Sequence, residues 1–134
     1  NYVRKFLGHN ISYTSRVIYG NQLGRKFNVP TINLSLGLNY PALWGVYIAY
    51  VYIDKKRYNA VASIGKNPTV SSADTYKLEA HLLDVDLDLY GKIATIEILQ
   101  FMREERKFDG LESLFTQIHL DLQIARDYFC QQEQ

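Results

Sequence analysis

The sequence has few cysteines, little net charge and no long apolar run, and each absence excludes a class of protein. Cys130 is the only cysteine among 134 residues, which excludes an internal disulfide framework and suits a reducing cytoplasm. With 15 basic and 14 acidic residues the net charge is +1, so charge does not favour general binding to nucleic acid or to an anionic membrane. No apolar segment approaches the roughly 18–20 residues that span a bilayer, and residues 1–6 lack the apolar stretch of a signal peptide. We therefore expect one cytoplasmic globular domain.

Aromatic residues, in contrast, are abundant. Eleven tyrosines and six phenylalanines favour the pleated, half-buried surfaces of β-strands. Strand-forming residues predict six strands, at 11–19, 31–36, 46–53, the second arm of a hairpin ending at 64, 76–85 and 92–101. We expect that hairpin to turn at the charged residues 54–57, residues 67–74 to form a loop, and residues 2–7 to be the end of a helix that stops at Gly8.

The C-terminal part has the repeat of an α-helix. Asp109-Gly110-Leu111-Glu112 has the form of a capping box, which predicts a helix start at this point. Apolar residues then recur at steps of three and four: Leu111, Leu114, Phe115, Ile118, Leu122 and Ala125. We therefore expect a mainly β fold, a small closed six-stranded antiparallel Greek-key barrel with one C-terminal amphipathic α-helix packed on it.

The first predicted strand is followed by a polar loop that contains Gly20, Gly24, Arg25 and Lys26. Backbone amides bared by glycine can approach phosphate oxygens, and nearby cations offset the phosphate charge. The Walker loop does not match, because its Gly-Lys-Ser/Thr ending is missing and Pro30 prevents the helix that should follow. A Rossmann fingerprint lacks its third glycine. An ordinary surface turn is the better interpretation of these residues alone.

Two neutral oxygen donors follow that loop. If residues 31–33 are extended, Thr31 and Asn33 share one face of the strand and Ile32 faces the other way. A hydroxyl and an amide side by side can hold part of the shell of Mg²⁺, with water and ATP phosphates completing it. Taken alone, the two side chains are better explained as partners of backbone groups in a turn.

Residues 20–33, GNQLGRKFNVPTIN, resemble the signature of the riboflavin kinases, a glycine loop ending Gly-Arg-x-x-Gly-Phe-Pro-Thr-Ala-Asn. The matching residues are Gly24, Arg25, Pro30, Thr31 and Asn33. Where the family usually has Gly, Phe and Ala, this chain has Asn28, Val29 and Ile32. Four further blocks resemble the family in the expected order, at 61–69, 78–84, 88–92 and 103–111. The resemblance therefore covers nearly the whole chain and implies an enzyme that phosphorylates riboflavin with ATP and Mg²⁺.

The predicted strand at 76–85 carries the residue that this resemblance makes catalytic. Glu79 and His81 alternate with apolar neighbours and so share one strand face. From the residues alone, a half-exposed strand that shows polar groups to water is the simpler interpretation. The resemblance makes Glu79 the carboxylate that accepts the proton of the terminal ribityl hydroxyl as this oxygen attacks the γ-phosphoryl group of ATP.

The resemblance also implies the remaining sites. Mg²⁺ would be held by Thr31 and Asn33, and the phosphates of ATP by the loop residues Gly20, Gly24, Arg25 and Lys26 with Pro30. The adenosine end would lie near His81, Asp84 and Tyr90. The flavin would contact Arg103, Arg106 and Phe108, although a solvated charged turn at 103–107 explains the charges there equally well.

Bacterial kinases of this family are commonly the C-terminal half of a bifunctional enzyme whose N-terminal half adenylylates FMN to FAD. Residues 1–10 would be the remnant of the connector between the halves, and residues 11–134 the kinase domain, although Gly8-His9-Asn10 departs from the usual Gly-Arg-Pro. The chain begins without Met, which agrees with the hypothesis that it is the kinase portion and makes FMN but not FAD.

Two other classes of protein compete with this interpretation. A non-catalytic flavin-binding barrel would explain the aromatic residues but not the glycine loop joined to residues 30–33. An oligonucleotide-binding barrel would use tyrosines as stacking platforms, but the balanced charge argues against a basic groove.

Overall fold

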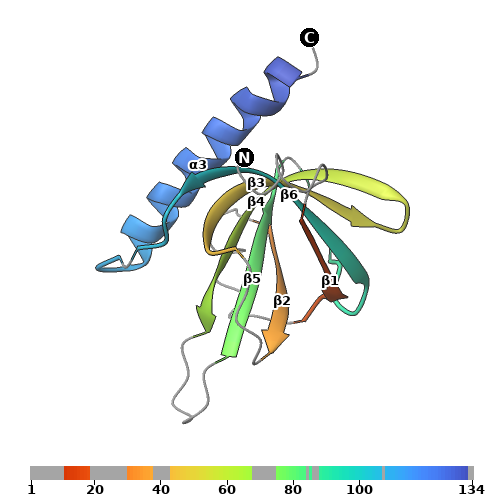
Figure 1. Ribbon diagram of the computed structural model, residues 1–134. Helices are drawn as coiled ribbons and strands as arrows, with labels where there is room; N and C mark the ends of the chain where they lie inside the picture. The colour runs from red at the N-terminus through yellow and green to blue at the C-terminus, as the bar shows by residue number, and fades with distance from the viewer. Residues whose placement is uncertain are drawn as a thin grey trace.

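The computed structural model describes residues 11–18, 30–37, 43–67, 75–83, 85, 88–106 and 108–132. In Figure 1 these residues form strands that curve around a common axis and one long helix that lies against them. The predicted helix end at 2–7, the connector at 1–10 and positions 20–29 and 68–74 of the predicted loops lie outside the described residues. No helix in the described part of the chain is both long enough and apolar enough to cross a bilayer.

The six predicted strands are all present, and all pair antiparallel. They are β1 (Ser12–Arg16), β2 (Thr31–Gly37), β3 (Gly45–Ile53), β4 (Lys56–Asn67), β5 (Thr75–Leu82) and β6 (Ile93–Arg103). Their order in the sheet is β1-β6-β3-β4-β5-β2. Strands β3, β4 and β5 are therefore neighbours in sequence order, and β6 returns beside β3, which is the Greek-key arrangement that we expected.

The two edge strands of this sheet, β1 and β2, approach each other and nearly close the barrel. The backbone N–H of Ile18 donates a hydrogen bond of 2.8 Å to the carbonyl of Asn33, forming an isolated antiparallel bridge. Strand β1 ends at Arg16, three residues before the predicted end of that strand at position 19. A single bridge beside Asn33 therefore links the two ends of the sheet.

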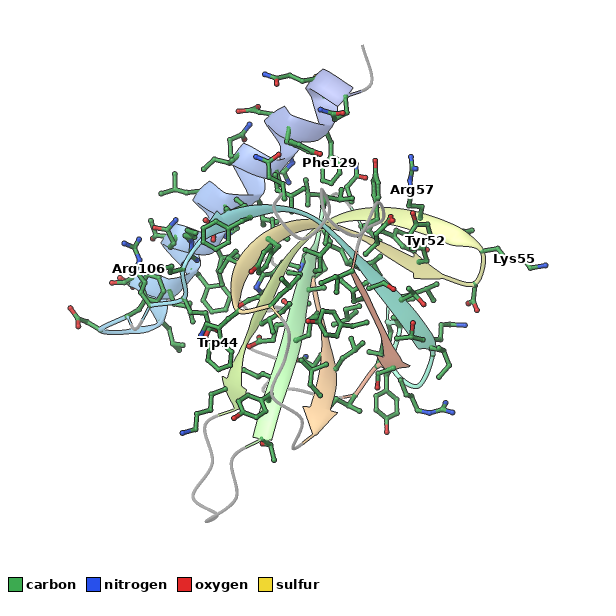
Figure 2. All side chains as sticks on the ribbon, viewed as in Figure 1. Trp44, Tyr52, Lys55, Arg57, Arg106 and Phe129 are labelled. Atoms are coloured by element: carbon green, nitrogen blue, oxygen red, sulfur yellow. The ribbon has the colours of Figure 1, made fainter. Side chains whose placement is uncertain are left out.

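The hairpin between β3 and β4 turns more tightly than the sequence suggested. Only Asp54 and Lys55 lie in the turn, with φ angles of 53° and 67°, whereas residues 56 and 57 already pair within β4. Two consecutive positive φ angles match the right-handed twist of the flanking strands, so a two-residue turn suffices. Figure 2 shows Lys55 at the tip of this hairpin.

The apolar side chains form two separate clusters. The first fills the barrel and includes Leu34, Val51, Ile64, Leu78, Leu82 and Ile96, each less than 2% exposed. The second lies between the outside of the barrel and helix α3 (Leu111–Gln132). It joins Val46, Ile48, Val61 and Leu99 of the strands to Phe115, Ile118, Leu122, Ala125 and Phe129 of the helix. The predicted barrel with a helix packed on it is confirmed.

The start of α3 differs from the predicted capping box. The N–H of Leu114 donates to the carbonyl of Gly110 at 3.1 Å, so Gly110 rather than Asp109 occupies the N-cap position. Leu111, which we expected on the packed face, is 41% exposed. A helical repeat gives the angular position of a residue, but it does not show whether a partner surface extends to that turn of the helix.

Candidate active site

The pairing of β2 with β5 brings together four of the predicted site residues. Thr31 is the register partner of His81, and Asn33 is the partner of Glu79. Facing residues on neighbouring antiparallel strands have Cβ atoms about 4.5–5.5 Å apart. Ile32, between the two β2 residues, is 4% exposed in the barrel interior, as its alternation predicted. Thr31, Asn33, Glu79 and His81 therefore share the outer face of the barrel.

Thr31 and His81 form a hydrogen bond across the two strands. The hydroxyl Oγ1 of Thr31 lies 2.9 Å from Nδ1 of His81, and His81 is only 7% exposed. Burial lowers the pKa of His81 below 6.5, although the negative charges of Glu79 and Asp121 act in the opposite direction. A neutral imidazole can accept the Thr31 proton at Nδ1, which orients the hydroxyl group of Thr31.

Glu79 is partly open to solvent and forms an ion pair on its own strand. Its carboxylate Oε1 lies 2.6 Å from Nζ of Lys77, and the two side chains are 24% and 30% exposed. A carboxylate held at one oxygen keeps acceptor capacity for a further donor. Glu79 is thus accessible to a substrate hydroxyl, as a general base must be.

The donor set for a metal consists of neutral oxygens. Thr31 and Asn33 are both half-buried on the same face of β2, and no group of three or more His, Cys, Asp or Glu among the described residues could hold a metal ion. A hydroxyl and an amide suit Mg²⁺ that keeps waters and takes phosphate oxygens as its other ligands. The residues present therefore fit Mg²⁺ delivered with a nucleotide better than a metal held by the protein alone.

Several residues expected to bind the nucleotide lie outside the described residues, namely Gly20, Gly24, Arg25, Lys26 and Asp84. Pro30, which follows the glycine loop, is described. Its carbonyl accepts the N–H of Leu82 at 2.9 Å, so the entry into β2 is attached to the end of β5. This bond fixes the position of Pro30 beside the end of β5.

Tyr90 belongs to the turn that precedes β6. Its side chain is 52% exposed, and its backbone N–H donates to Oδ1 of Asp88 at 3.1 Å. The next residue, Gly91, donates to the carbonyl of Val17 at 2.9 Å. Because Val17 precedes the bridge between Ile18 and Asn33, this turn lies on the Asn33 side of the barrel.

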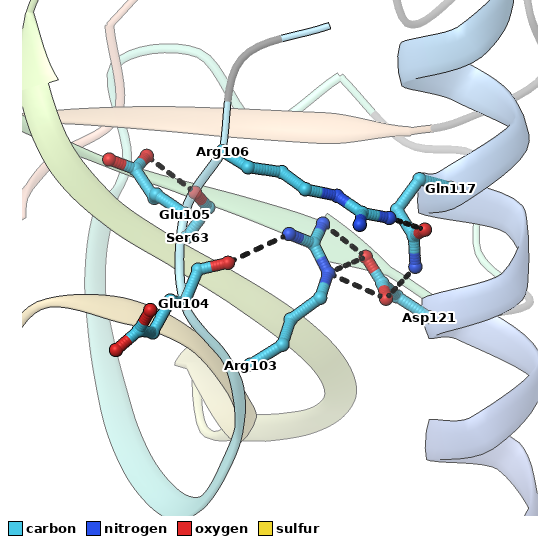
Figure 3. Close-up of polar contacts among 7 residues, drawn as sticks. All are labelled: Ser63, Arg103, Glu104, Glu105, Arg106, Gln117 and Asp121. Carbon is cyan, nitrogen blue, oxygen red and sulfur yellow. Dashed lines mark hydrogen bonds and ion pairs between the residues drawn. The ribbon is translucent and has the colours of Figure 1, made fainter.

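The C-terminal end of β6 is joined to α3 by a partly buried ion pair. Arg103 donates from Nε to Oδ1 of Asp121 at 3.0 Å and from Nη2 to Oδ2 at 2.7 Å (Figure 3). Asp121 carries a charge, yet it lies on the packed face of the helix and is only 2% exposed. This two-pronged geometry orients the guanidinium, and removing one partner would leave a buried charge unpaired.

A second arginine joins the same network. Arg106 donates to Oε1 of Gln117, and Nε2 of Gln117 donates to Oδ1 of Asp121 at 3.0 Å. The Arg106 guanidinium also lies 5.3 Å from the ring centroid of Phe108. The three residues expected to contact the flavin therefore lie at the end of β6 and in the loop that follows it, and both arginines join this region to α3.

Sequence reasoning missed Asp121 and Gln117. A signal was present, because the two residues are four apart on a helix and Asp121 interrupts the apolar face formed by Ile118, Leu122 and Ala125. A charged residue on a buried helix face needs a partner. The sequence, however, did not show which arginine supplies it.

The sequence model of the riboflavin kinase family matches residues 7–129. The chain belongs to the riboflavin kinase family. It is 39% identical over 122 residues to a bifunctional riboflavin kinase/FMN adenylyltransferase from Pseudomonas fluorescens, a match that covers 91% of this chain and 39% of that protein. This chain thus spans about two fifths of the length of the curated relatives it matches.

Two solved structures share the architecture of this riboflavin kinase family member. A crystal structure from Streptococcus pneumoniae, described as a macrolide-efflux protein, superposes with a TM-score of 0.81 at 32% identity and covers 93% of this chain and 41% of that one. Riboflavin kinase from Trypanosoma brucei superposes with a TM-score of 0.55 at 23% identity, over 90% of this chain and 80% of that one. The second similarity supports the fold alone.

Proposed function

We propose that this chain is a riboflavin kinase that transfers the γ-phosphoryl group of ATP to the ribityl 5′-hydroxyl of riboflavin, giving FMN and ADP. The observation that carries the proposal is the register of β2 and β5, which sets Thr31 opposite His81 and Asn33 opposite Glu79. Phosphoryl transfer depends on positioning a nucleotide beside an oriented acceptor. This register places candidate metal donors and a carboxylate at neighbouring points of one surface.

Glu79 acts as the general base. Its carboxylate accepts the proton of the ribityl hydroxyl while the hydroxyl oxygen forms a bond to the γ-phosphorus and the bond from that phosphorus to the leaving oxygen of ADP breaks. Lys77 holds Oε1 of the carboxylate at 2.6 Å, which limits the orientations that Glu79 can adopt. Thr31 and Asn33 would hold Mg²⁺, which would neutralise phosphate charge when bound with ATP.

The remaining contacts divide between the two ends of this reaction centre. The nucleotide is held by Gly20, Gly24, Arg25 and Lys26, with Pro30, His81, Asp84 and Tyr90 at the same end. The flavin is held at the end of β6 and by the loop that follows, through Arg103, Arg106 and Phe108. The two arginines are oriented by the network that reaches Asp121, and Phe108 lies beside Arg106. An aromatic ring suits packing against the isoalloxazine, and an arginine suits the phosphate of the product.

In its full protein we expect this domain to be joined to an N-terminal FMN adenylyltransferase domain and to work in the cytoplasm. The first expectation is supported by the bifunctional relatives, of which this chain covers about two fifths. The second is supported by the single free thiol of Cys130, which suits a reducing compartment.

Incubation of the 134-residue chain with riboflavin, ATP and Mg²⁺, followed by chromatographic separation of the flavins, tests the proposal. We expect FMN and ADP in equal amounts and no FAD. Retention of riboflavin without FMN formation would identify a flavin-binding barrel that is not a kinase. Formation of FAD would contradict the assignment of the adenylyltransferase step to a separate domain.

A further inference from the structure

Glu105 lies in the segment between β6 and α3 (residues 104–110), the flavin-side loop, but its side chain points away from the network with the helix. Figure 3 shows Arg103 extending from the end of β6 toward Asp121 on α3, and Glu105 extending toward Ser63 on β4. The Ser63 hydroxyl donates to Oε1 of Glu105 at 3.2 Å. Glu105 therefore connects the loop that is proposed to bind flavin with the strand beside Glu79.

Gly65 provides space for this carboxylate. A Cβ atom at Gly65 would overlap the carboxyl group of Glu105, so the carboxylate lies against bare backbone of β4. Burial there raises the pKa of Glu105, and the negative charge of Glu79 acts in the same direction, whereas the Ser63 hydrogen bond, Lys77 and Arg103 oppose the shift. The residue as a whole is exposed, so the carboxylate is only partly desolvated by its contact with β4.

The strand register links this carboxylate to the proposed base. Ser63 is the partner of Glu79 across β4 and β5, and Gly65 is the partner of Lys77. Neighbouring strands are about 4.7–4.9 Å apart. Glu79, Ser63 and Glu105 thus follow one another along the outer face of the barrel, in the direction that leads from the reaction centre to the flavin-side loop.

We propose that Glu105 is a specificity-determining residue that accepts hydrogen bonds from hydroxyl groups of the ribityl chain. This proposal rests on the proposed kinase function, because it assumes a substrate whose terminal hydroxyl reaches Glu79 and whose ring lies at the loop after β6. The chain between those two ends must then pass Glu105. A carboxylate only accepts hydrogen bonds and offers about four lone pairs, of which Ser63 uses one.

The competing role for Glu105 is mechanical, a tether of the loop to β4 through Ser63. A tether would affect the ring and the ribityl chain of the ligand alike. Direct recognition would affect only ligands that carry the ribityl hydroxyls. Riboflavin and lumiflavin, which has a methyl group in place of the ribityl chain, separate the two roles.

The test measures equilibrium binding of both flavins by quenching of their fluorescence, with MgADP present so that no phosphoryl transfer occurs. A hydrogen bond to a charged group contributes about 1.5–3 kcal/mol, so Glu105→Ala should weaken riboflavin binding by about tenfold or more. Lumiflavin binding should change less than about twofold. Ser63→Ala, which removes the group that orients the carboxylate, should give a smaller loss of the same kind.

Glu104→Ala is the matched control, because it removes the same charge one residue earlier and keeps the backbone carbonyl that accepts from Arg103 at 3.1 Å. It should leave the affinities for both flavins unchanged. Equal losses for riboflavin and lumiflavin in Glu105→Ala, or no loss for either, would overturn the proposal. The binding assay does not require turnover, so a failure to form FMN in the parallel kinase assay would count against the kinase function alone.

Discussion

Strand β5 presents two different surfaces, and the difference between them separates stability from chemistry. Leu78, Ala80 and Leu82 point into the barrel and are at most 1% exposed. Glu79 and His81 point outward, opposite Asn33 and Thr31 of β2. The inner surface contributes burial of apolar area, whereas the outer surface contributes polar groups whose positions matter more than their packing. Substitutions on the two sides should therefore affect different measurements.

Leu78→Ala should produce the largest change in stability. Leu78 is 0% exposed in the barrel interior, and truncating such a leucine leaves a cavity that costs about 3 kcal/mol in the free energy of unfolding. Urea denaturation gives this quantity, and kcat per folded molecule should stay close to that of the unmodified chain. A fall in kcat as large as that of the neighbouring outward-facing variant would show that the two faces do not act separately.

Glu79→Gln should produce the converse result. The turnover number should fall by about 10²-fold or more, the scale of general base catalysis. The free energy of unfolding should change by less than about 1 kcal/mol, because the lost ion pair with Lys77 is partly exposed. Steady-state kinetics measures the first effect and urea denaturation the second. Turnover near that of the unmodified chain would remove Glu79 from the role of base.

Thr31→Ala and Asn33→Ala should each raise the Mg²⁺ concentration needed for half-maximal rate by about tenfold, because each removes one oxygen donor from the proposed metal site. Ser35→Ala, two residues further along the same face of β2, serves as the control and should leave this concentration unchanged. If neither Thr31→Ala nor Asn33→Ala alters the Mg²⁺ requirement, the proposed metal site is wrong.

His81→Asn should produce the smallest effect, a change in how stability depends on pH. Burial lowers the pKa of His81 in the folded state below 6.5, so between that lowered pKa and 6.5 the unfolded chain binds more protons than the folded chain. The free energy of unfolding should therefore fall on acidification from pH 7.5 to 5.5, with a contribution of about 1 kcal/mol or less from this residue.

The asparagine variant retains a polar atom near the position of Nδ1 and has no group that titrates in this range. Its stability should consequently decrease less between pH 7.5 and 5.5 than that of the unmodified chain. Thermal denaturation at both pH values measures the difference. Equal decreases in the two proteins would show that His81 does not couple folding to pH.

Local pattern accounts for much of what could be predicted. The alternation of Thr31, Ile32 and Asn33 and that of the residues around Glu79 correctly predicted which side chains share a face, because side chains in any strand alternate. The helix was predicted from its apolar repeat, which Phe115, Ile118, Leu122 and Ala125 confirm by their burial. The errors were at the ends of elements: the hairpin turn, the N-cap of α3 and Leu111 in its first turn. Shifting the end of a strand or helix by one or two residues changes its local free energy little.

Local pattern could not predict the residue pairs that form the candidate site. Thr31 and His81 are 50 positions apart, and their contact depends on which strands become neighbours in the closed barrel. Arg103 and Asp121 pair because α3 packs on the strands at one particular angle. The same holds for Ser63 and Glu105, which meet only because Gly65 leaves room beside them.

The sequence by itself determined the strands, the amphipathic helix, the outward faces of Thr31, Asn33, Glu79 and His81, and the family resemblance carried by residues 20–33. Each of these follows from periodicity or from residues close together in the chain. Only the tertiary structure decided that Asn33 faces Glu79, that Arg103 is paired with Asp121, and that Glu105 lies beside the proposed base. The physical reason is that strand register and helix docking are set by burial of the whole apolar surface, which no local segment contains.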